Sequence, residues 1–350
     1  MRLDIAGSDN VRLKRIKKRL RKHAGSYIGL IFLSLLFSTS ADSLELQNYP
    51  TLRVLTEELK ADCFEPAELQ RLFSAIEFKQ NIVDAMTKPA EKSMTWNQYR
   101  GLFIKSERIQ QGVGFWRTHQ ADLSKAALEY GVAEEVIVAI IGVESRFGEY
   151  RGKHGVFESL ATLVAGYPRR SAFFGNELKA FLLLCKEQGF DPLEVKGSYA
   201  GAVGYPQFIA TSYRAYAVDF NGDGRTDIVN DPVDAIGSVA NYFNKHGWRA
   251  DEPVTSAFNS YSQALLEAPT VKLATDRTVA EIVKTGAKLV DLLEPDLKVG
   301  LVSLEGNNGP VVRLTHHNFY VITKYNRSTM YAMAVHELSQ AVKVAMGKTQ

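Results

Sequence analysis

The stretch "IIGVESRFG" (Ile140–Gly148) decides the fold, because in it an apolar run ends in one carboxylate, Glu144, followed by Ser145 and Arg146. In the longer run "AEEVIVAIIGVES" (Ala133–Ser145), hydrophobic residues lie nearly all round the predicted helix, which indicates that it is buried. Glu144 then stands at the C-terminal end of this helix. Apolar surroundings and the negative end of the helix dipole both disfavour an ionised carboxylate, and a protonated carboxyl group suits general acid catalysis. Alternatively, Glu144 turns into water or pairs with Arg146.

The first 41 residues differ in composition from the rest of the chain. A basic run, "RLKRIKKRLRK" (Arg12–Lys22), precedes the apolar run "YIGLIFLSLLF" (Tyr27–Phe37) and the small residues Thr39 and Ala41. This order is typical of a secretory signal peptide, which we expect to be cleaved after Ala41. The apolar run is shorter than the roughly 20 residues that a membrane-spanning helix needs. An uncleaved anchor is the alternative, and it would be the one membrane contact that we expect.

The net charge depends on this leader. The whole chain of 350 residues has 42 basic and 39 acidic residues and a net charge of +3. Residues 1–41 hold nine of the basic and two of the acidic residues, so the remainder carries a net charge of −4. The basic character therefore belongs to the leader, and it does not predict nucleic-acid binding.

The chain has two cysteines, Cys63 and Cys185. Neither lies near the end of the leader, so we do not expect a lipid anchor there. Cys185 lies in "FLLLCKE" and is most simply a buried small hydrophobic residue. A disulfide between the two cysteines is compatible with an export compartment, but the sequence alone does not predict it.

Hydrophobic spacing divides the rest of the chain into four segments. Residues 42–130 are predicted as an N-terminal helical domain, and residues 131–252 as a helical core that contains a loop-rich stretch at 191–232. Residues 253–322 are predicted as a small β-rich domain, and residues 323–350 as a C-terminal helix that returns to the core. The expected fold class is mainly α with a small β domain (α+β).

Within the β-rich segment, we expect strands at "VKLAT" (271–275), "VGLVSLE" (299–305), "VVRLT" (311–315) and "FYVIT" (319–323). A short helix is expected between the first two of these, at "TVAEIVKTGAKL" (278–289).

A second notable stretch is the loop "GSYAGAVGYPQF" (Gly197–Phe208). Its small residues let the backbone approach a ligand closely, and Ser198, Tyr199, Tyr205 and Gln207 offer polar or stacking partners. Aromatic and amide groups in this combination suit a sugar. Alternatively, the stretch is a structural glycine-rich loop.

A third stretch, "DFNGDGRTDIVNDPVD" (Asp219–Asp234), follows most of the pattern of an EF-hand calcium loop. The expected ligands are oxygen atoms of Asp219, Asn221, Asp223, Arg225 (through its backbone carbonyl), Asp227 and Asp234. Asn230 stands where the pattern has Glu, so Asp234, or alternatively Asp231, must complete the site. The sequence therefore predicts structural calcium, with an acid-rich turn as the alternative.

Six segments in order and spacing resemble the membrane-bound lytic murein transglycosylase B family, which cleaves peptidoglycan. They are "VIVAIIGVESRFG", "LATLVAGYPRRSAFF", "GSYAGAVGYPQF", "YAVDFNGDG", "DPVDAIGSVANYF" and "VITKYNRSTMYAMAV". The resemblance implies a lysozyme-like catalytic core, a calcium loop and no organic cofactor. It implies that Glu144 is the catalytic acid/base, Ser198 an active-site hydroxyl and Gln207 an amide in the substrate groove. The other substrate-binding positions that we expect are Tyr99, Phe173, Tyr205, Phe208, Tyr242, Tyr325, Asn326 and Tyr331. Phe173 stands where relatives can carry Tyr, and the calcium loop is one residue longer than expected.

The implied reaction cleaves the β-1,4 bond between N-acetylmuramic acid and N-acetylglucosamine and forms a 1,6-anhydromuramoyl product. Lysozyme-like hydrolysis uses two carboxylates, and the family motif supplies only Glu144. A water-using muramidase, with Glu149 or Glu158 as its second carboxylate, is a competing interpretation. A non-catalytic peptidoglycan-binding protein and a calcium-sensing switch are competing interpretations from different functional classes.

The resemblance also sets the expected location and partners. They are the periplasm of a Gram-negative bacterium and the glycan strands of peptidoglycan, with other cell-wall enzymes as further candidates. We expect no nucleic-acid partner and no lipoprotein anchor.

Overall fold

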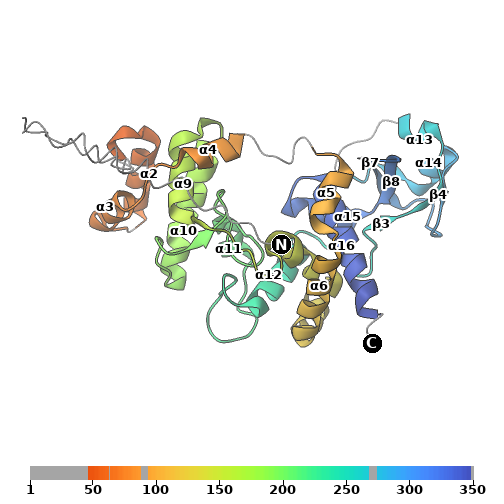
Figure 1. The fold of residues 1–350 in the computed structure, drawn as a ribbon, viewed down its shortest axis with the longest axis horizontal. Helices are drawn as coiled ribbons and strands as arrows, with labels where there is room; N and C mark the ends of the chain where they lie inside the picture. The colour runs from red at the N-terminus through yellow and green to blue at the C-terminus, as the bar shows by residue number, and fades with distance from the viewer. Residues whose placement is uncertain (1–45, 63, 88–93, 268–273, 348–350) are drawn as a thin grey trace, which may run out of the picture. The chain divides into compact units, whose positions relative to one another are not determined.

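The computed structural model describes residues 46–62, 64–87, 94–267 and 274–347, and these belong to one compact unit (Figure 1). The helices are η1 (Leu46–Asn48), α2 (Pro50–Ala61), α3 (Pro66–Ser74), α4 (Gln80–Thr87), α5 (Trp96–Phe103), α6 (Ser106–Thr118), α7 (Gln120–Tyr130), α8 (Glu134–Ser145), α9 (Val156–Gly166), η3 (Pro168–Arg170), α10 (Ser171–Gln188), α11 (Ala210–Tyr216), α12 (Pro232–Lys245), α13 (Gln263–Glu267), α14 (Val279–Lys284), α15 (His317–Tyr325) and α16 (Thr329–Gly347). The strands are β1 (His154–Gly155), β2 (Lys196–Gly197), β3 (Thr255–Ser256), β4 (Phe258–Ser260), β5 (Arg277–Thr278), β6 (Lys288–Leu289), β7 (Lys298–Gly306) and β8 (Gly309–Thr315). The predicted signal peptide and Cys63 lie outside the described residues.

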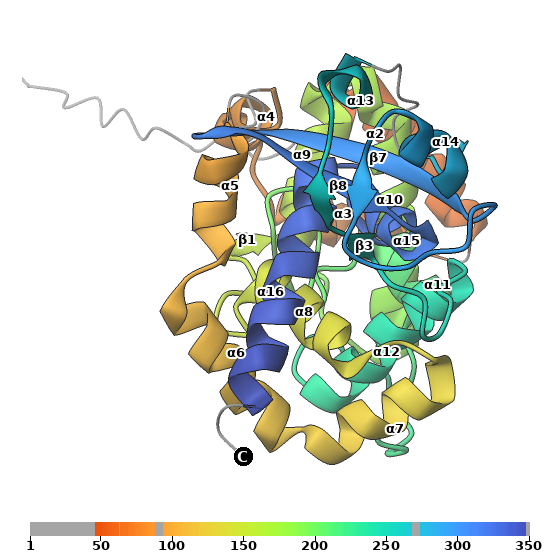
Figure 2. The ribbon, with the colours of Figure 1, turned by 90° about the vertical axis from the view of Figure 1, so that its right-hand side faces the viewer.

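Helix α8 is buried in the core, as its sequence predicts. Its residues from Val136 to Gly142 are buried without a break, and Ile137, Ile140 and Ile141 have no exposed surface. Full burial of each such side chain contributes roughly 1.5–3 kcal/mol to stability. Helices α6, α7, α12 and α16 pack around α8, and Figure 2 shows α16 running beside it. The helix that ends in Glu144 is therefore held from several sides.

The helices before α8 and those after it form one continuous core. Helices α2 and α4 pack against α9, and α9 lies beside α10 (Figure 1). Cys185 on α10 is buried, and this burial raises the pKa of its thiol to about 12. Helices in the N-terminal segment and a buried Cys185 agree with the sequence, and the division into domains stays a prediction. Every helix within the described ranges is too short or too polar to cross a lipid bilayer.

The β-rich segment has a sheet and a small core of its own. The four-stranded sheet has the order β3-β8-β7-β5, and all of its pairs are antiparallel. Strands β7 and β8 form a hairpin that closes at the pair Gly306 and Gly309. Leu265, Ile282, Val299 and Leu314 belong to the core of this segment. The strands predicted at 299–305 and 311–315 are confirmed.

One sequence prediction of secondary structure is wrong. The run 319–323, predicted as a strand, lies in helix α15, whereas the loop-rich stretch 191–232 is mainly loop, as predicted, and contains the short helix α11. Phe319, Val321 and Ile322 are all buried, and a short apolar run buried on every side gives no periodicity to separate helix from strand. In the predicted strand 271–275, residues 274 and 275 lie outside any strand, and residues 271–273 lie outside the described ranges.

His336 on α16 gives the fold an expected dependence on pH. Its Nε2 atom lies 2.9 Å from Thr255 Oγ1, and burial lowers the pKa of the imidazole from 6.5 to about 4. Between these values the unfolded chain binds the proton and the folded chain does not, so stability is lost as the pH falls below 6.5. Within that window, we expect protonation of His336 to lower the free energy of unfolding by about 1.4 kcal/mol for each unit by which the pH falls.

Urea unfolding at pH 7 and pH 5 measures this effect. The loss of stability between the two pH values should be about 2 kcal/mol smaller in His336→Gln than in the unmodified protein. An equal loss in both proteins would show that His336 does not cause the dependence.

Candidate active site

Glu144 is placed by a sharp turn that ends α8. Arg146 and Phe147 both have left-handed backbone conformations, with φ of 53° and 59°, which non-glycine residues adopt at a cost of about 1–3 kcal/mol each. Ser145 holds this turn, because its Oγ accepts the Gly148 N–H at 3.0 Å and its carbonyl accepts the Tyr150 N–H at 2.8 Å. Helix α8 therefore stops at Ser145, one residue after Glu144, whose side chain is half-buried.

Arg108 on α6 also supports this helix end, and the sequence did not predict its role. The side chain is buried, and its Nη1 donates to the Gly142 carbonyl at 2.9 Å. Burial, followed by the charge of Arg146, lowers the pKa of Arg108. The guanidinium donates to one of the carbonyls in the last turn of α8, which have no N–H partner within the helix. One signal was present in the sequence, since Arg108 stands on the apolar face of its helix with Gly112, a buried position.

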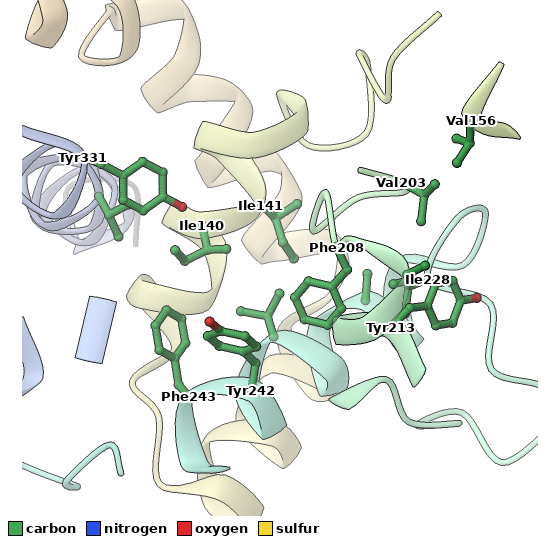
Figure 3. Close-up of a cluster of buried hydrophobic side chains, with 14 of the residues drawn as sticks. Ile140, Ile141, Val156, Val203, Phe208, Tyr213, Ile228, Tyr242, Phe243 and Tyr331 are labelled. Carbon is green, nitrogen blue, oxygen red and sulfur yellow. The ribbon is translucent and has the colours of Figure 1, made fainter. Parts of the chain in front are cut away.

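Tyr331 on α16 contacts the carboxyl group of Glu144 directly. Its hydroxyl donates to Glu144 Oε1 at 2.5 Å. Burial of the ring, followed by the charge of Glu144, raises the pKa of Tyr331 well above 10, so the phenol stays protonated and remains a donor. Figure 3 shows Tyr331 beside Ile140, with its hydroxyl directed toward α8. Tyr99 on α5 is close enough to contribute to the pKa of Tyr331.

Aromatic side chains join this pair to the Gly/Tyr loop, residues 197–208. Tyr325 stacks on Tyr331 with ring centroids 6.4 Å apart and donates its hydroxyl to the Pro206 carbonyl at 2.6 Å. Phe208 and Tyr242 lie 5.8 Å and 4.8 Å from the Tyr325 ring. In Figure 3, Phe208 and Tyr242 pack beneath the isoleucines of α8. Segments distant in the sequence thus meet around Glu144.

The Gly/Tyr loop also packs on the segment that follows α8. Strands β1 and β2 pair, which places residues 154–155 beside residues 196–197. Gln207 donates its amide to the Arg151 carbonyl at 3.2 Å, and the Arg151 guanidinium lies 5.2 Å from the centroid of the Tyr205 ring. Ser198 Oγ accepts the Ala202 N–H at 3.0 Å, which leaves its hydroxyl hydrogen for another acceptor.

The contacts of two predicted substrate-binding residues, Phe173 and Asn326, are with residues outside this cluster. Phe173 on α10 packs against Phe174. The Arg170 guanidinium lies over the Phe173 ring, 4.0 Å from the centroid of that ring. Asn326 follows α15 and is exposed, and its carbonyl accepts the Ser328 N–H. Their roles stay predictions.

The two carboxylates that a water-using mechanism could employ have partners elsewhere. Glu158 accepts the Glu77 N–H at 3.2 Å and lies 3.6 Å from Lys79 Nζ. Glu149 is exposed and accepts a hydrogen bond from the Gln111 amide at 3.3 Å. These contacts favour a site that works with Glu144 alone.

The predicted calcium loop is wound around Asp219. The two oxygens of this carboxylate accept the N–H groups of Gly222, Asp223 and Gly224, and the two glycines have the positive φ angles that such a turn requires. Asn221 accepts the Asp223 N–H through its side-chain oxygen. The loop therefore brings together carboxylate and amide oxygens, and oxygen atoms are the ligands that calcium prefers.

The remaining acidic residues tie the loop to α12. Asp234 is buried, and its oxygens accept the N–H groups of Phe220, Asn221 and Asp227. Asp231 caps α12 and accepts from the Asn221 amide. Asp227 accepts from the backbone of Asn230 and from its side chain, and the carbonyl of Arg225 remains a predicted ligand. Among the described residues, no three acidic or imidazole groups converge into a formed metal site.

Comparisons with known proteins place this geometry in a family. The sequence profile of the transglycosylase SLT domain matches residues 47–340. Membrane-bound lytic murein transglycosylase B of Escherichia coli (strain K12) is 40% identical over 281 residues, which cover 80% of this chain and 76% of the relative.

Solved structures agree with this match. Soluble lytic transglycosylase SltB1 from Pseudomonas aeruginosa has a TM-score of 0.80 and 44% identity, covering 85% of this chain and 100% of that chain. The Escherichia coli lytic transglycosylase Slt35 in complex with calcium has a TM-score of 0.80 and 38% identity, covering 87% of this chain and 96% of that chain. The predicted fold class, mainly α with a lysozyme-like core and a small β segment, is confirmed. The chain therefore belongs to the transglycosylase SLT family, in which it is similar to lytic murein transglycosylase B.

Proposed function

We propose that the protein is a lytic transglycosylase that degrades peptidoglycan, with Glu144 as its one catalytic acid and base. The observation that carries this proposal is the contact between Glu144 and the buried Tyr331, which Tyr325 connects to the Gly/Tyr loop. A half-buried carboxyl group beside a permanently protonated phenol is suited to release a proton and to take one back.

In the proposed reaction, Glu144 first protonates the oxygen that joins N-acetylmuramic acid to N-acetylglucosamine. The bond between this oxygen and the muramoyl C1 breaks, and positive charge develops on the muramoyl ring. The acetamido group of the substrate steadies that charge. Glu144 then takes the proton from the muramoyl C6 hydroxyl, whose oxygen attacks C1 and forms the 1,6-anhydro product. No water is consumed, because an intramolecular nucleophile has a very high effective concentration.

Side chains of the Gly/Tyr loop orient the substrate in this proposal. The Ser198 hydroxyl donates to the acetamido group of the muramoyl unit. Gln207 contacts a saccharide hydroxyl, and Tyr205 presents an aromatic face to a sugar ring. The amide of Gln207 is held toward the Arg151 and Gly204 carbonyls, so its oxygen remains for the substrate. The other residues proposed to bind the substrate are Tyr99, Phe173, Phe208, Tyr242, Tyr325, Asn326 and Tyr331.

Digestion of purified sacculi tests the proposed reaction. Mass spectrometry of the released fragments should show 1,6-anhydromuramoyl ends, which are lighter by one water than reducing ends. Reducing ends as the main product would support a muramidase, and binding without any release would support a non-catalytic protein.

Tyr331→Phe tests the contact that carries the proposal. The substitution removes a hydrogen bond to a carboxyl group, a bond of the kind that contributes about 1.5–3 kcal/mol, so we expect kcat to fall about tenfold or more. Tyr320→Phe is the comparison, because this tyrosine is outside the proposed substrate-binding set and its hydroxyl lies 2.6 Å from Thr315 Oγ1. A kcat for Tyr331→Phe equal to that of the unmodified protein would contradict the assignment.

We propose that the predicted calcium loop, Asp219–Asp234, holds a structural calcium ion. Asp219, Asn221, Asp223, the Arg225 carbonyl, Asp227 and Asp234 would supply the oxygen ligands, and the cation would offset the repulsion among their charges. A relative, Slt35, was solved in complex with calcium. Because a ligand that binds only the folded state stabilises it, chelation should lower the melting temperature without specifically abolishing sugar affinity.

The control variant is Asp219→Asn, whose melting temperature should be the same with calcium and without it. A melting temperature of the unmodified protein that does not respond to chelator or to added calcium would overturn the calcium proposal. Loss of sugar affinity with no change in melting temperature would instead support a calcium-sensing switch.

The proposed location is the periplasm of a Gram-negative bacterium, and the proposed partner is the glycan strand. The relative in Escherichia coli is described as membrane-bound. In this chain any membrane contact would come from residues 1–41. Fractionation of cells that express the full chain separates a released periplasmic form from one that stays with the membrane.

A further inference from the structure

The ring of Phe147 lies where α6, α8 and α16 pack together, next to two glycines. A Cβ atom at Gly142 on α8 would lie 2.5 Å from Phe147 Cζ, and one at Gly112 on α6 would lie 3.2 Å from the same atom. On α6 the ring also packs against Phe115, with ring centroids 5.5 Å apart. The two glycines therefore leave the space that the tip of the ring fills.

This packing holds the turn that follows Glu144. Arg146 and Phe147 both have left-handed backbone conformations, which non-glycine residues keep only where the surrounding structure holds them. Arg146 is exposed, so its side chain supplies little packing. The Phe147 ring packs against the core, and the Phe147 N–H donates to the Ile141 carbonyl at 3.3 Å. Residues 141 and 147 are thus joined, and Glu144 lies midway between them in the sequence.

Helix α16 brings the partner of Glu144 to the same helices. Leu338 on α16 faces Gly142, because a Cβ atom at this glycine would lie 3.3 Å from Leu338 Cδ2. Tyr331, whose hydroxyl donates to Glu144, stands seven residues before Leu338 and therefore on the same face of α16. A shift of the Phe147 ring would change the position of Glu144 relative to Tyr331.

We infer that Phe147 is a positioning residue for Glu144, because its ring holds the turn in which the Glu144 carboxyl group meets the Tyr331 hydroxyl. The inference rests on the proposed function, in which Glu144 is the catalytic acid and base. In this role Phe147 acts through the backbone of the turn rather than through contact with the substrate. A change at Phe147 should therefore lower kcat and leave KM nearly unchanged.

An exchange of size between Phe147 and Gly142 tests this role. Phe147→Leu removes the tip of the ring, and Gly142→Ala adds a methyl group where that tip lies. A misplacement of about 1 Å can lower catalysis by about 100-fold, so we expect each single change to lower kcat on sacculi about tenfold or more. In the double variant, the methyl group occupies space that the shorter side chain leaves empty. Its kcat should therefore be higher than that of either single variant, with KM nearly unchanged in all three.

The contact between Glu144 and Tyr331 supplies a second readout. Phe147→Leu should lower kcat less in a Tyr331→Phe background than in the unmodified protein, because the effects of residues that act together are not additive. Phe181→Leu is the matched control. Phe181 is a buried residue on α10, which packs against α2, α9 and α11. Its shortening should lower the melting temperature and leave kcat unchanged.

Several results would overturn the inference. One is a kcat of Phe147→Leu or of Gly142→Ala equal to that of the unmodified protein, and another is a double variant no more active than its single variants. Equal effects of Phe147→Leu with and without the Tyr331 hydroxyl, or an equal loss of kcat in Phe181→Leu, would also overturn it. If the unmodified protein formed no 1,6-anhydro ends, or if Glu144→Gln kept its activity, the proposed function would fail instead, so the two failures are distinguishable.

Discussion

Glu144→Gln is expected to lower kcat on peptidoglycan by about 10³-fold or more, because general acid and base catalysis each contribute roughly 10²- to 10⁴-fold. Glutamine keeps the size of the side chain and can still accept the hydrogen bond from Tyr331. The amide cannot donate a proton to the glycosidic oxygen or take one from the C6 hydroxyl. The melting temperature and the affinity for glycan should therefore stay close to those of the unmodified protein while turnover is lost.

Glu158→Gln is the control for this prediction. Glu158 is one of the two carboxylates that a water-using mechanism could employ, but it contacts Lys79 and the Glu77 backbone. In this variant we expect kcat to stay close to that of the unmodified protein. We expect Tm to fall, because the substitution weakens an ion pair that joins two helical segments. If Glu144→Gln still released anhydromuropeptides at a near-native rate, or if Glu158→Gln lost as much activity as Glu144→Gln, the assignment of Glu144 would be wrong.

The second large effect is expected from Gly152→Ala. Gly152 has φ of +94°, and an added Cβ atom would lie 2.0 Å from the Gly197 carbonyl carbon and 2.6 Å from the Ser198 nitrogen. These are backbone atoms, so the loop itself must move. We expect the free energy of unfolding to fall by about 3 kcal/mol or more, through backbone strain and overpacking together. Activity should fall as well, since the displaced segment carries Ser198.

Gly189→Ala separates the two causes. Gly189 caps α10 with φ of +70°, but an added Cβ atom there meets nothing within 4 Å. It should cost only the strain of a left-handed residue, about 1–2 kcal/mol. Urea unfolding of both variants measures the difference. Equal destabilisation of the two variants would show that the contact between Gly152 and the Gly/Tyr loop does not matter.

The sequence predicted the features that depend on local pattern. Helix α8 was predicted because its residues are apolar all round. The same rule failed at 319–323, where a short buried run of aromatic and β-branched residues has no usable period and folds as α15.

The partners of Glu144 did not follow from any local pattern. Tyr331 stands 187 positions further along the chain, and its selection came from the resemblance to a family. Arg108 was missed altogether, because its role depends on the meeting of α6 with the end of α8. Contacts between distant segments depend on the packing of whole helices, which composition and spacing do not encode.

Digestion of sacculi in water enriched in ¹⁸O tests the central claim most directly. If the C6 hydroxyl of the muramoyl unit is the nucleophile and Glu144 takes its proton, the new muramoyl ends contain no ¹⁸O and are of the anhydro type. New reducing ends that carry ¹⁸O would show that water attacks C1, and they would contradict the mechanism proposed for Glu144.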